Sequence, residues 1–242
     1  ILSKGKIALD AKLLSEIIRK LSGGESDITI ESDEKYNTTI TCDNSVFHIQ
    51  GKNGDEFSYL PFIEKDHFIC LSQFTLKEVI RQTLFSISVN DSNKMMTGEL
   101  FQVTDNELKV VSLDGHRMSI RKIELKDHYE NTKVIVPGKT LSEISKILGG
   151  DNEKEVLIYF SANHILFEFD QTHVVSRLIE GDYFKISQML SNDYETKVSI
   201  NKKEFLDSID RANLLIREGD KKPIIINILN GLLQVNVNSA IG

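Results

Sequence analysis

Apolar residues recur along this chain at the spacing of amphipathic helices, and between these stretches the spacing changes to that of short strands. Four segments place apolar side chains three or four residues apart, which predicts one helix in each. Their apolar stripes begin at Leu13, Leu76, Leu141 and Phe205. Short apolar runs follow each predicted helix, so the pattern is one helix and then several strands, repeated.

The predicted strands are separated by turn-forming pairs such as Asp43-Asn44, Asp105-Asn106 and Asn230-Gly231. Connections of this length allow antiparallel hairpins but are too short for most parallel crossovers. We therefore predict the α+β class, with mainly antiparallel sheets and each helix on one face of a sheet. The predicted strands cover residues 6–9, 28–31, 38–42, 46–50, 100–103, 107–112, 117–123, 134–136, 156–160, 165–169, 174–179, 224–229 and 232–237.

The chain also repeats itself in sequence. The stretch KLLSEI at residues 12–17 returns as KTLSEI at residues 139–144, each time after a short apolar strand. A second unit, FTLKEVI at residues 74–80, returns as INKKEFL at residues 200–206. Two alternating units of this length indicate domains in tandem rather than the turns of a solenoid.

Charge is distributed unevenly along the sequence. The 242 residues carry a net charge of −7, which argues against a protein coated in basic charge for gripping nucleic acid. In the four predicted helices, however, basic residues outnumber acidic ones. If the helices share one side of the assembly, that side attracts phosphates through weak, salt-screened contacts. Alternatively, lysine is present there simply because it is a good helix former.

Location and redox state follow from what the sequence contains. It has no apolar run of membrane-spanning length and no secretory signal at its start, which predicts a cytoplasmic protein with no membrane partner. Its two cysteines, Cys42 and Cys70, form no CxxC pair, and we expect two buried, reduced thiols.

The sharpest short motif is SLDGHRM at residues 112–118, which is predicted to form a tight turn between two strands. Asp114 and His116 could act as an acid–base pair, with Arg117 binding a phosphate. However, the sequence contains no nucleophile signature, no metal-ligand spacing and no phosphate-binding glycine loop. We therefore predict no catalytic residue, no metal site and no cofactor. The turn is either purely structural or part of an adaptable binding surface, because methionines and leucine flank it.

Four stretches together resemble one known family. They are TGELF at residues 97–101, LDGHRM at 113–118, VIVPGK at 134–139 and SRLIEG at 176–181. They resemble the bacterial DNA polymerase III β subunits, the sliding clamps, and the resemblance covers essentially the whole chain. It implies a DNA clamp fold of tandem β-α-β-β-β repeats, with two chains joined as a homodimer ring, helices lining the hole and antiparallel sheets outside.

On this template the chain divides into three parts. Residues 1–70 resemble the second half of clamp domain I, residues 71–195 a complete domain II with its linker, and residues 196–242 the first half of domain III. The start of domain I and the end of domain III are therefore expected to be missing from this sequence.

The resemblance implies a processivity factor that encircles double-stranded DNA without reading its sequence and is not itself an enzyme. Expected partners are the DNA polymerase III catalytic subunit, the clamp loader and repair polymerases, through short Q-L-x-L-F-like motifs. The side chains expected to face DNA are Lys77, Arg81, Lys94, Lys139, Lys146 and Lys203.

Partners of this family insert their motif into a cleft between domains II and III. Carried over by motif, its walls are Met96, Leu113, Gly115, His116, Arg117, Met118, Phe184, Gln188 and Met189. This sequence departs from the family at Leu113, where a smaller polar residue is usual, and at Gln188, where arginine is usual. The linker reads Tyr183-Phe184-Lys185-Ile186 instead of the family's proline-containing pattern. We therefore expect a more apolar pocket.

Two alternatives stay open on the sequence alone. One is an α+β repeat scaffold that binds protein partners without DNA, against which the basic helices argue. The other is a phosphate-substrate enzyme that uses Asp114, His116 and Arg117, against which the missing nucleophile and phosphate loop argue.

Overall fold

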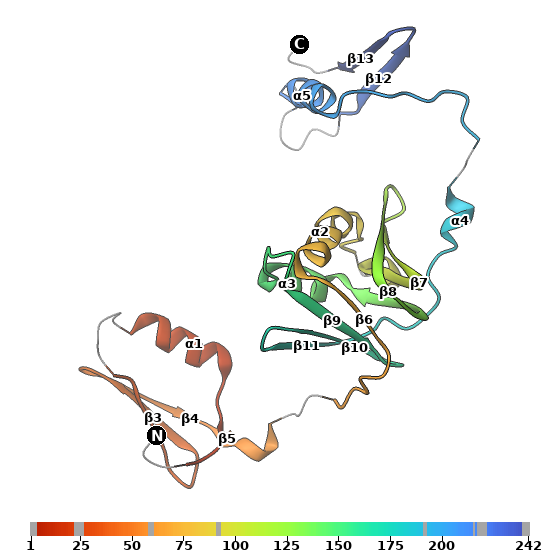
Figure 1. The fold of residues 1–242 in the computed structure, drawn as a ribbon. Helices are drawn as coiled ribbons and strands as arrows, with labels where there is room; N and C mark the ends of the chain where they lie inside the picture. The colour runs from red at the N-terminus through yellow and green to blue at the C-terminus, as the bar shows by residue number, and fades with distance from the viewer. Residues whose placement is uncertain are drawn as a thin grey trace. The chain divides into compact units, whose positions relative to one another are not determined.

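The structure, a computed structural model, describes residues 4–21, 27–57, 61–90, 93–190, 193–214, 216 and 222–238. The chain forms two compact units, Ile1–Tyr183 and Phe184–Gly242, and each is described by itself. Every strand pairing in the described ranges is antiparallel, which confirms the predicted α+β class (Figure 1). None of the described helices is long and apolar enough to cross a membrane.

The first part of the chain has one helix and a three-stranded sheet. Its elements are β1 (Ile7–Ala8), α1 (Ala11–Lys20), β2 (Thr29–Ser32), β3 (Asn37–Cys42), β4 (Ser45–Gln50), β5 (Lys52–Asn53) and η1 (Gly54–Glu56). Helix α1 begins after Asp10, whose carboxylate accepts a hydrogen bond from the Leu13 N–H at 2.8 Å. This bond satisfies one of the free N–H groups of the first turn. The predicted turn between β3 and β4 is confirmed, with Asp43 at a φ of 50°.

The central part contains two helices and two sheets. Its elements are β6 (Phe68–Ser72), α2 (Gln73–Thr83), η2 (Leu84–Ser86), η3 (Lys94–Thr97), β7 (Gly98–Leu113), β8 (Met118–Pro137), α3 (Gly138–Ile147), β9 (Glu155–Phe160), β10 (His164–Phe169) and β11 (Thr172–Arg177). One sheet has the order β11-β10-β9-β6, and β7 pairs with β8 in the other. Helices α2 and α3 contact each other and lie side by side (Figure 1).

The β7–β8 hairpin corrects one prediction. The pair Asp105-Asn106 was expected to reverse the chain between two short strands, but β7 continues through it as one strand. The pairing with β8 shifts register on either side of Asp105, which has a φ of 55°. The extra residues are on β8, since residues 103–107 of β7 face residues 124–132, so β8 bulges opposite Asp105 where a turn was expected. Here β8 continues, and it joins the predicted strands at residues 117–123 and 134–136.

The core of the central part lies where the two helices meet the sheets. The predicted apolar stripes are confirmed, since Leu76 and Ile80 of α2 and Leu141 and Ile144 of α3 are all fully buried. They pack in one cluster with side chains from both sheets, including Phe101 and Phe167. Burial of this apolar surface fixes the two helices on the sheets.

The two cysteines are free thiols, as predicted, but only Cys42 is buried, whereas Cys70 is half-buried. Burial, and to a smaller extent the Glu155 carboxylate nearby, raise the pKa of the Cys70 thiol to about 11. At neutral pH Cys70 is therefore the neutral thiol, which is a poor nucleophile.

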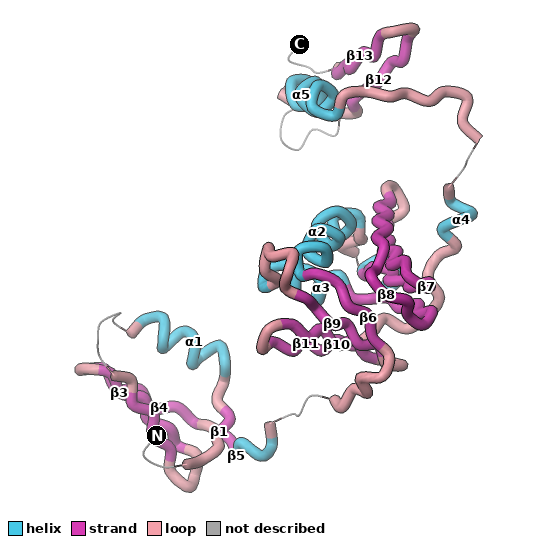
Figure 2. The backbone as a smooth tube through the Cα atoms, in the orientation of Figure 1, coloured by secondary structure: helices cyan, strands magenta, loops and turns pink. Residues whose placement is uncertain are grey.

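The second unit repeats the helix-and-strands pattern. Its elements are α4 (Ile186–Met189), α5 (Lys202–Asn213), β12 (Ile224–Leu229) and β13 (Leu232–Val237). Helix α5 lies beside the β12–β13 hairpin (Figure 2). The predicted turn at Asn230-Gly231 is confirmed, because Leu229 pairs with Leu232 across it.

Candidate functional site

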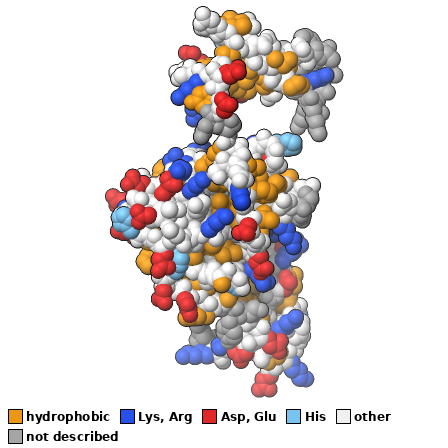
Figure 3. All heavy atoms as spheres, turned by 90° about the vertical axis from the view of Figure 1, so that its right-hand side faces the viewer, with side chains coloured by type: hydrophobic (Ala, Val, Ile, Leu, Met, Phe, Trp, Pro, Cys, Tyr) orange, Lys and Arg blue, Asp and Glu red, His pale blue; other side chains and the backbone are white. Residues whose placement is uncertain are grey.

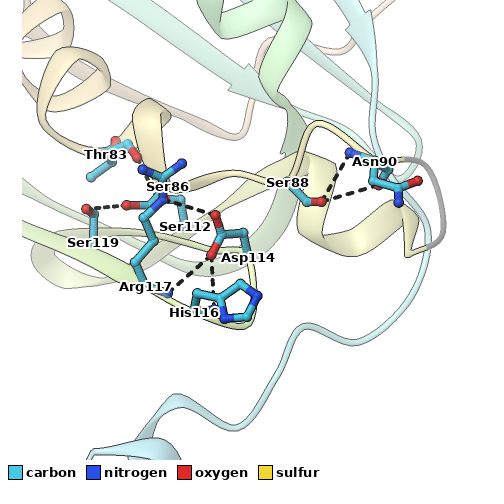
Figure 4. A network of polar contacts seen from close by, with 9 residues as sticks. All are labelled: Thr83, Ser86, Ser88, Asn90, Ser112, Asp114, His116, Arg117 and Ser119. Atoms are coloured by element: carbon cyan, nitrogen blue, oxygen red, sulfur yellow. Dashed lines mark hydrogen bonds and ion pairs between the residues drawn. The ribbon is translucent and has the colours of Figure 1, made fainter. Parts of the chain in front are cut away.

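The turn between β7 and β8 is built around the Asp114 carboxylate. One carboxylate oxygen accepts hydrogen bonds from the backbone N–H groups of His116 at 3.1 Å and Arg117 at 3.2 Å (Figure 4). The other accepts from the Arg117 Nε at 3.0 Å. The backbone bond from His116 is the largest cause that lowers the pKa of Asp114. Asp114 is therefore ionised at neutral pH and holds the turn in one conformation.

The same turn exposes the residues that follow Asp114. Gly115 has a φ of +87°, which other residues rarely adopt, and no atom lies within 4 Å of the position a Cβ would take. Gly115, His116 and Arg117 are all exposed. Asp114 bonds to the backbone of His116, so an acid–base pair between the two side chains is not among the contacts of this turn. Asp114 thus serves as the hydrogen-bond acceptor that holds this turn.

The expected cleft residues occupy different environments. Met96 lies in η3 and Met118 at the start of β8, and both are half-buried. Leu113 is only 1% exposed and belongs to the core of the first unit. Phe184, Gln188 and Met189 belong to the second unit, where Phe184 is half-buried and the other two are exposed. Gly115, His116, Arg117 and Met118 therefore lie together at one turn of the first unit, whereas the three linker residues belong to the second unit.

A groove of about 630 Å³ lies along α2 and α3, and it includes Arg117 from the turn. Its apolar lining includes Phe85, which is 59% exposed, and Val89, which is fully exposed. The Arg117 guanidinium lies 5.8 Å from the centre of the Phe85 ring. Phe85 and Val89 were not among the site residues predicted from the sequence, although apolar and serine residues alternate at residues 85–89.

Three of the expected DNA-facing side chains, Lys77, Arg81 and Lys139, line this groove. They come from two helices far apart in sequence, and Glu78 is the one acidic side chain among the lining residues. Arg81 forms two hydrogen bonds with Glu78, at 2.8 and 2.7 Å, and these lower the pKa of Glu78. Lys77 Nζ donates to the Leu148 carbonyl oxygen at 2.9 Å. Part of the positive charge is therefore already paired.

The other three expected side chains lie elsewhere. Lys146 of α3 is paired with Glu143 at 2.8 Å, and Lys94 is exposed in η3. Lys203 is exposed at the start of α5 in the second unit. Figure 3 shows basic, acidic and hydrophobic side chains on one face of the molecule. Within the described ranges, no group of three or more His, Cys, Asp or Glu side chains could hold a metal ion.

Comparison with known proteins places this arrangement in one class. A structure from Eubacterium rectale described as a DNA polymerase III beta subunit has a TM-score of 0.89 and 63% identity, over 98% of this chain and 64% of that one. A DNA polymerase sliding clamp from Bacillus subtilis has a TM-score of 0.81 and 33% identity, over 96% of this chain and 64% of that one. The fold is thus that of the sliding clamps.

Sequence comparisons agree. Residues 2–61 match the N-terminal domain of the DNA polymerase III beta subunit, and residues 70–185 match its central domain. The beta sliding clamp of Staphylococcus epidermidis is 36% identical over 235 residues, which are 97% of this chain and 62% of that protein. The chain belongs to the DNA polymerase III beta subunit family, and it spans 62% of the length of this curated relative.

Proposed function

We propose that this chain is part of a DNA sliding clamp, a non-catalytic processivity factor of the cytoplasm. In this proposal two copies form a homodimer ring around double-stranded DNA. Residues 1–70 supply the second half of domain I, residues 71–195 supply domain II, and residues 196–242 supply the first half of domain III. The relatives named as sliding clamps support the proposal at the level of the family.

The observation that carries the proposal is the pairing of α2 and α3. Their contact puts Lys77, Arg81 and Lys139 on one surface of a protein whose net charge is −7. We assign this surface, with Lys94, Lys146 and Lys203, to the DNA. Exposed, partly paired cations attract phosphates weakly and in a salt-dependent way. Weak attraction suits a ring that slides, because retention then comes from encirclement rather than from tight contacts.

The turn after β7 is assigned to partner recognition. Its exposed residues Gly115, His116 and Arg117, together with Met96 and Met118, form one wall of a peptide-binding cleft. The linker residues Phe184, Gln188 and Met189 are also assigned to partner recognition, and Leu113 supports the turn from inside the core. The occupants are Q-L-x-L-F-like motifs of the polymerase III catalytic subunit, the clamp loader and repair polymerases, whose apolar anchors carry most of the binding free energy.

Retention on circular DNA tests the proposal. The chain, extended at both ends to the length of its relatives, is loaded by a relative's clamp loader onto a nicked plasmid and separated by gel filtration. We expect co-elution with the circle and release when the plasmid is linearised, because only a closed ring is held topologically. Peptide binding without retention on the circle would instead support the DNA-independent scaffold.

A further inference from the structure

The segment Leu178–Tyr183, here called the strap, lies against β7 and the turn that leads into it. The backbone N–H groups of Leu178 and Ile179 donate to the carbonyl oxygens of Asn163 and Ile135, both at 2.9 Å. The Ile179 side chain packs so closely on Gly98 that a Cβ there would lie 2.7 Å from Ile179 Cδ1. At its end, the Tyr183 hydroxyl donates to the Val111 carbonyl oxygen at 3.3 Å.

Glu99, the residue after Gly98, is buried in the same region. It is 0% exposed, and neither carboxyl oxygen has a hydrogen-bond partner within the described part of the chain. A buried polar group without a partner is destabilising, and for an ionised carboxylate the cost is larger still. The burial of Glu99 is thus unfavourable for folding, and Glu99 belongs to neither the proposed DNA surface nor the proposed peptide cleft.

The Thr83 hydroxyl, which interacts with Glu99, and three serine hydroxyls of η2, β7 and β8 already have hydrogen-bond partners. Thr83 Oγ1 donates to the Val79 carbonyl oxygen at 2.8 Å, and Ser112 Oγ donates to the Thr83 carbonyl oxygen at 2.6 Å. The Ser86 and Ser119 hydroxyls bond to each other at 2.8 Å (Figure 4). Thr83 and Ser112 thus already donate to backbone carbonyl oxygens, and the side-chain interaction of Thr83 with Glu99 favours the ionised form less than burial disfavours it.

Glu99 and Tyr183 are two titratable groups that interact with each other. The pKa of Glu99 is raised to about 8 because burial, which raises it, outweighs the interaction with the Thr83 side chain, which lowers it. Burial is also the main cause that raises the pKa of Tyr183, and the Glu99 carboxyl raises it further. In the described residues Tyr183 is thus the titratable group that faces Glu99 from the strap, and no charged side chain from α2, β7 or β8 contributes to the shift of Glu99.

We infer that Glu99 is a positioning residue whose protonation keeps the strap closed on β7, and that loss of this proton favours an open strap. The closed strap covers a neutral carboxyl, which costs little to bury. When the strap opens, Glu99 is exposed to water, its pKa returns to the ordinary value of a glutamate, and it ionises at neutral pH. The inference concerns the central part alone and does not rest on the proposed function.

Linkage gives the direction and the pH window of the effect. The closed state binds the Glu99 proton up to about pH 8, whereas an exposed glutamate releases it near its ordinary pKa of 4.5. Between these values the open state carries fewer protons, so raising the pH favours opening. The opening equilibrium constant therefore rises about tenfold per pH unit in this window and levels off above it.

Hydrogen exchange at the amides of Leu178 and Ile179 tests this, because both amides are hydrogen bonded only when the strap is closed. Exchange is measured on the whole chain from pH 6 to 9 and corrected for the intrinsic rate. For the unmodified chain we expect the opening constant to rise about 30-fold from pH 6 to 7.5. For Glu99→Gln, which stays neutral, we expect no change with pH.

Two controls keep the test decisive. If the amide of Glu99→Gln disturbs the core, Glu99→Leu serves as a second variant, because it replaces the carboxyl with an apolar group. Its opening constant should also be independent of pH. Glu180→Gln removes an exposed carboxylate from the strap itself and should leave the pH dependence intact. A flat profile in the unmodified chain overturns the inference. So does an opening constant at Leu178 and Ile179 that equals the one at the core amides of α2 and β9 at every pH, since Glu99 would then titrate only on global unfolding.

Discussion

The Arg117 guanidinium stacks over the Phe85 ring at 5.8 Å and at the same time bonds to Asp114. This contact joins the turn after β7 to the end of α2, two segments that are separate in sequence. A cation over an aromatic face contributes about 0.5–1 kcal/mol at an exposed site. The contact therefore orients Arg117 more than it stabilises the fold, and it places a cation at the rim of an apolar groove.

Removing the ring should release Arg117 without unfolding the protein. We expect Phe85→Ala to lower the free energy of unfolding by less than about 1 kcal/mol, because Phe85 is largely exposed. Chemical denaturation measures this, and Arg117→Ala together with Phe85→Ala completes a double-mutant cycle. A coupling energy near zero would show that the stacking has no energetic consequence.

Truncating the two half-buried methionines should weaken peptide binding. We expect Met96→Ala with Met118→Ala to reduce the affinity for a labelled Q-L-D-L-F peptide by more than about 1 kcal/mol, as truncation of apolar anchors does. Fluorescence anisotropy measures it, and Met95→Ala is the matched control, because Met95 lies beside Gly181 and outside the proposed cleft. Unchanged affinity in the double variant would remove these residues from the cleft.

Charge reversal on the helices should change the salt dependence of DNA retention. For Lys77→Glu with Lys146→Glu we expect a larger loss at low salt than at high salt, and a log–log salt slope reduced by about 1 for each lost phosphate contact. Lys122→Glu with Lys154→Glu is the control, since these exposed lysines lie on β8 and just before β9. A salt-independent loss in the helix variant would indicate misfolding.

Gly138 at the start of α3 should tolerate no side chain. A Cβ there would lie 2.2 Å from Ile87 Cδ1 and 2.9 Å from the Thr97 carbonyl oxygen. We expect Gly138→Ala to lower the free energy of unfolding by about 1–3 kcal/mol through overpacking, despite the better helix propensity of alanine. Gly150→Ala, where no atom lies within 4 Å, should be nearly neutral. Equal effects in thermal unfolding would contradict the packing argument.

Glu99 should also affect the pH dependence of global stability. Its pKa in the folded protein, about 8, lies above its ordinary value of 4.5, so unfolding releases a proton between these values. Stability should therefore fall as the pH rises through this window, by about 1.4 kcal/mol per pH unit relative to Glu99→Gln. Urea unfolding of both proteins at pH 5, 6 and 7 checks it. Parallel curves for the two proteins would show that Glu99 is not a buried neutral acid.

The sequence determined the local elements of this protein and, through its motifs, the family. The stripes at Leu76 and Leu141 predicted α2 and α3, because helical periodicity is a property of neighbouring residues. The Asn230-Gly231 turn was predicted for the same reason, since turn chemistry is local. The stretch from Leu113 to Met118, together with the one from Val134 to Lys139, indicated the family because such motifs are read from the sequence alone.

Only the tertiary structure decided which of these residues are covered. Asp105 has the residue type of a turn, but it lies inside β7 opposite a bulge in β8. Leu113 is next to the exposed turn residues in the sequence, but its side chain is buried in the core. From the sequence alone Glu99 would be expected on the surface, as glutamates usually are, but it is fully buried in the fold beside Tyr183 of the strap. Burial depends on contacts between distant segments, and these contacts also decide which side chains lose water and so which ones change their pKa.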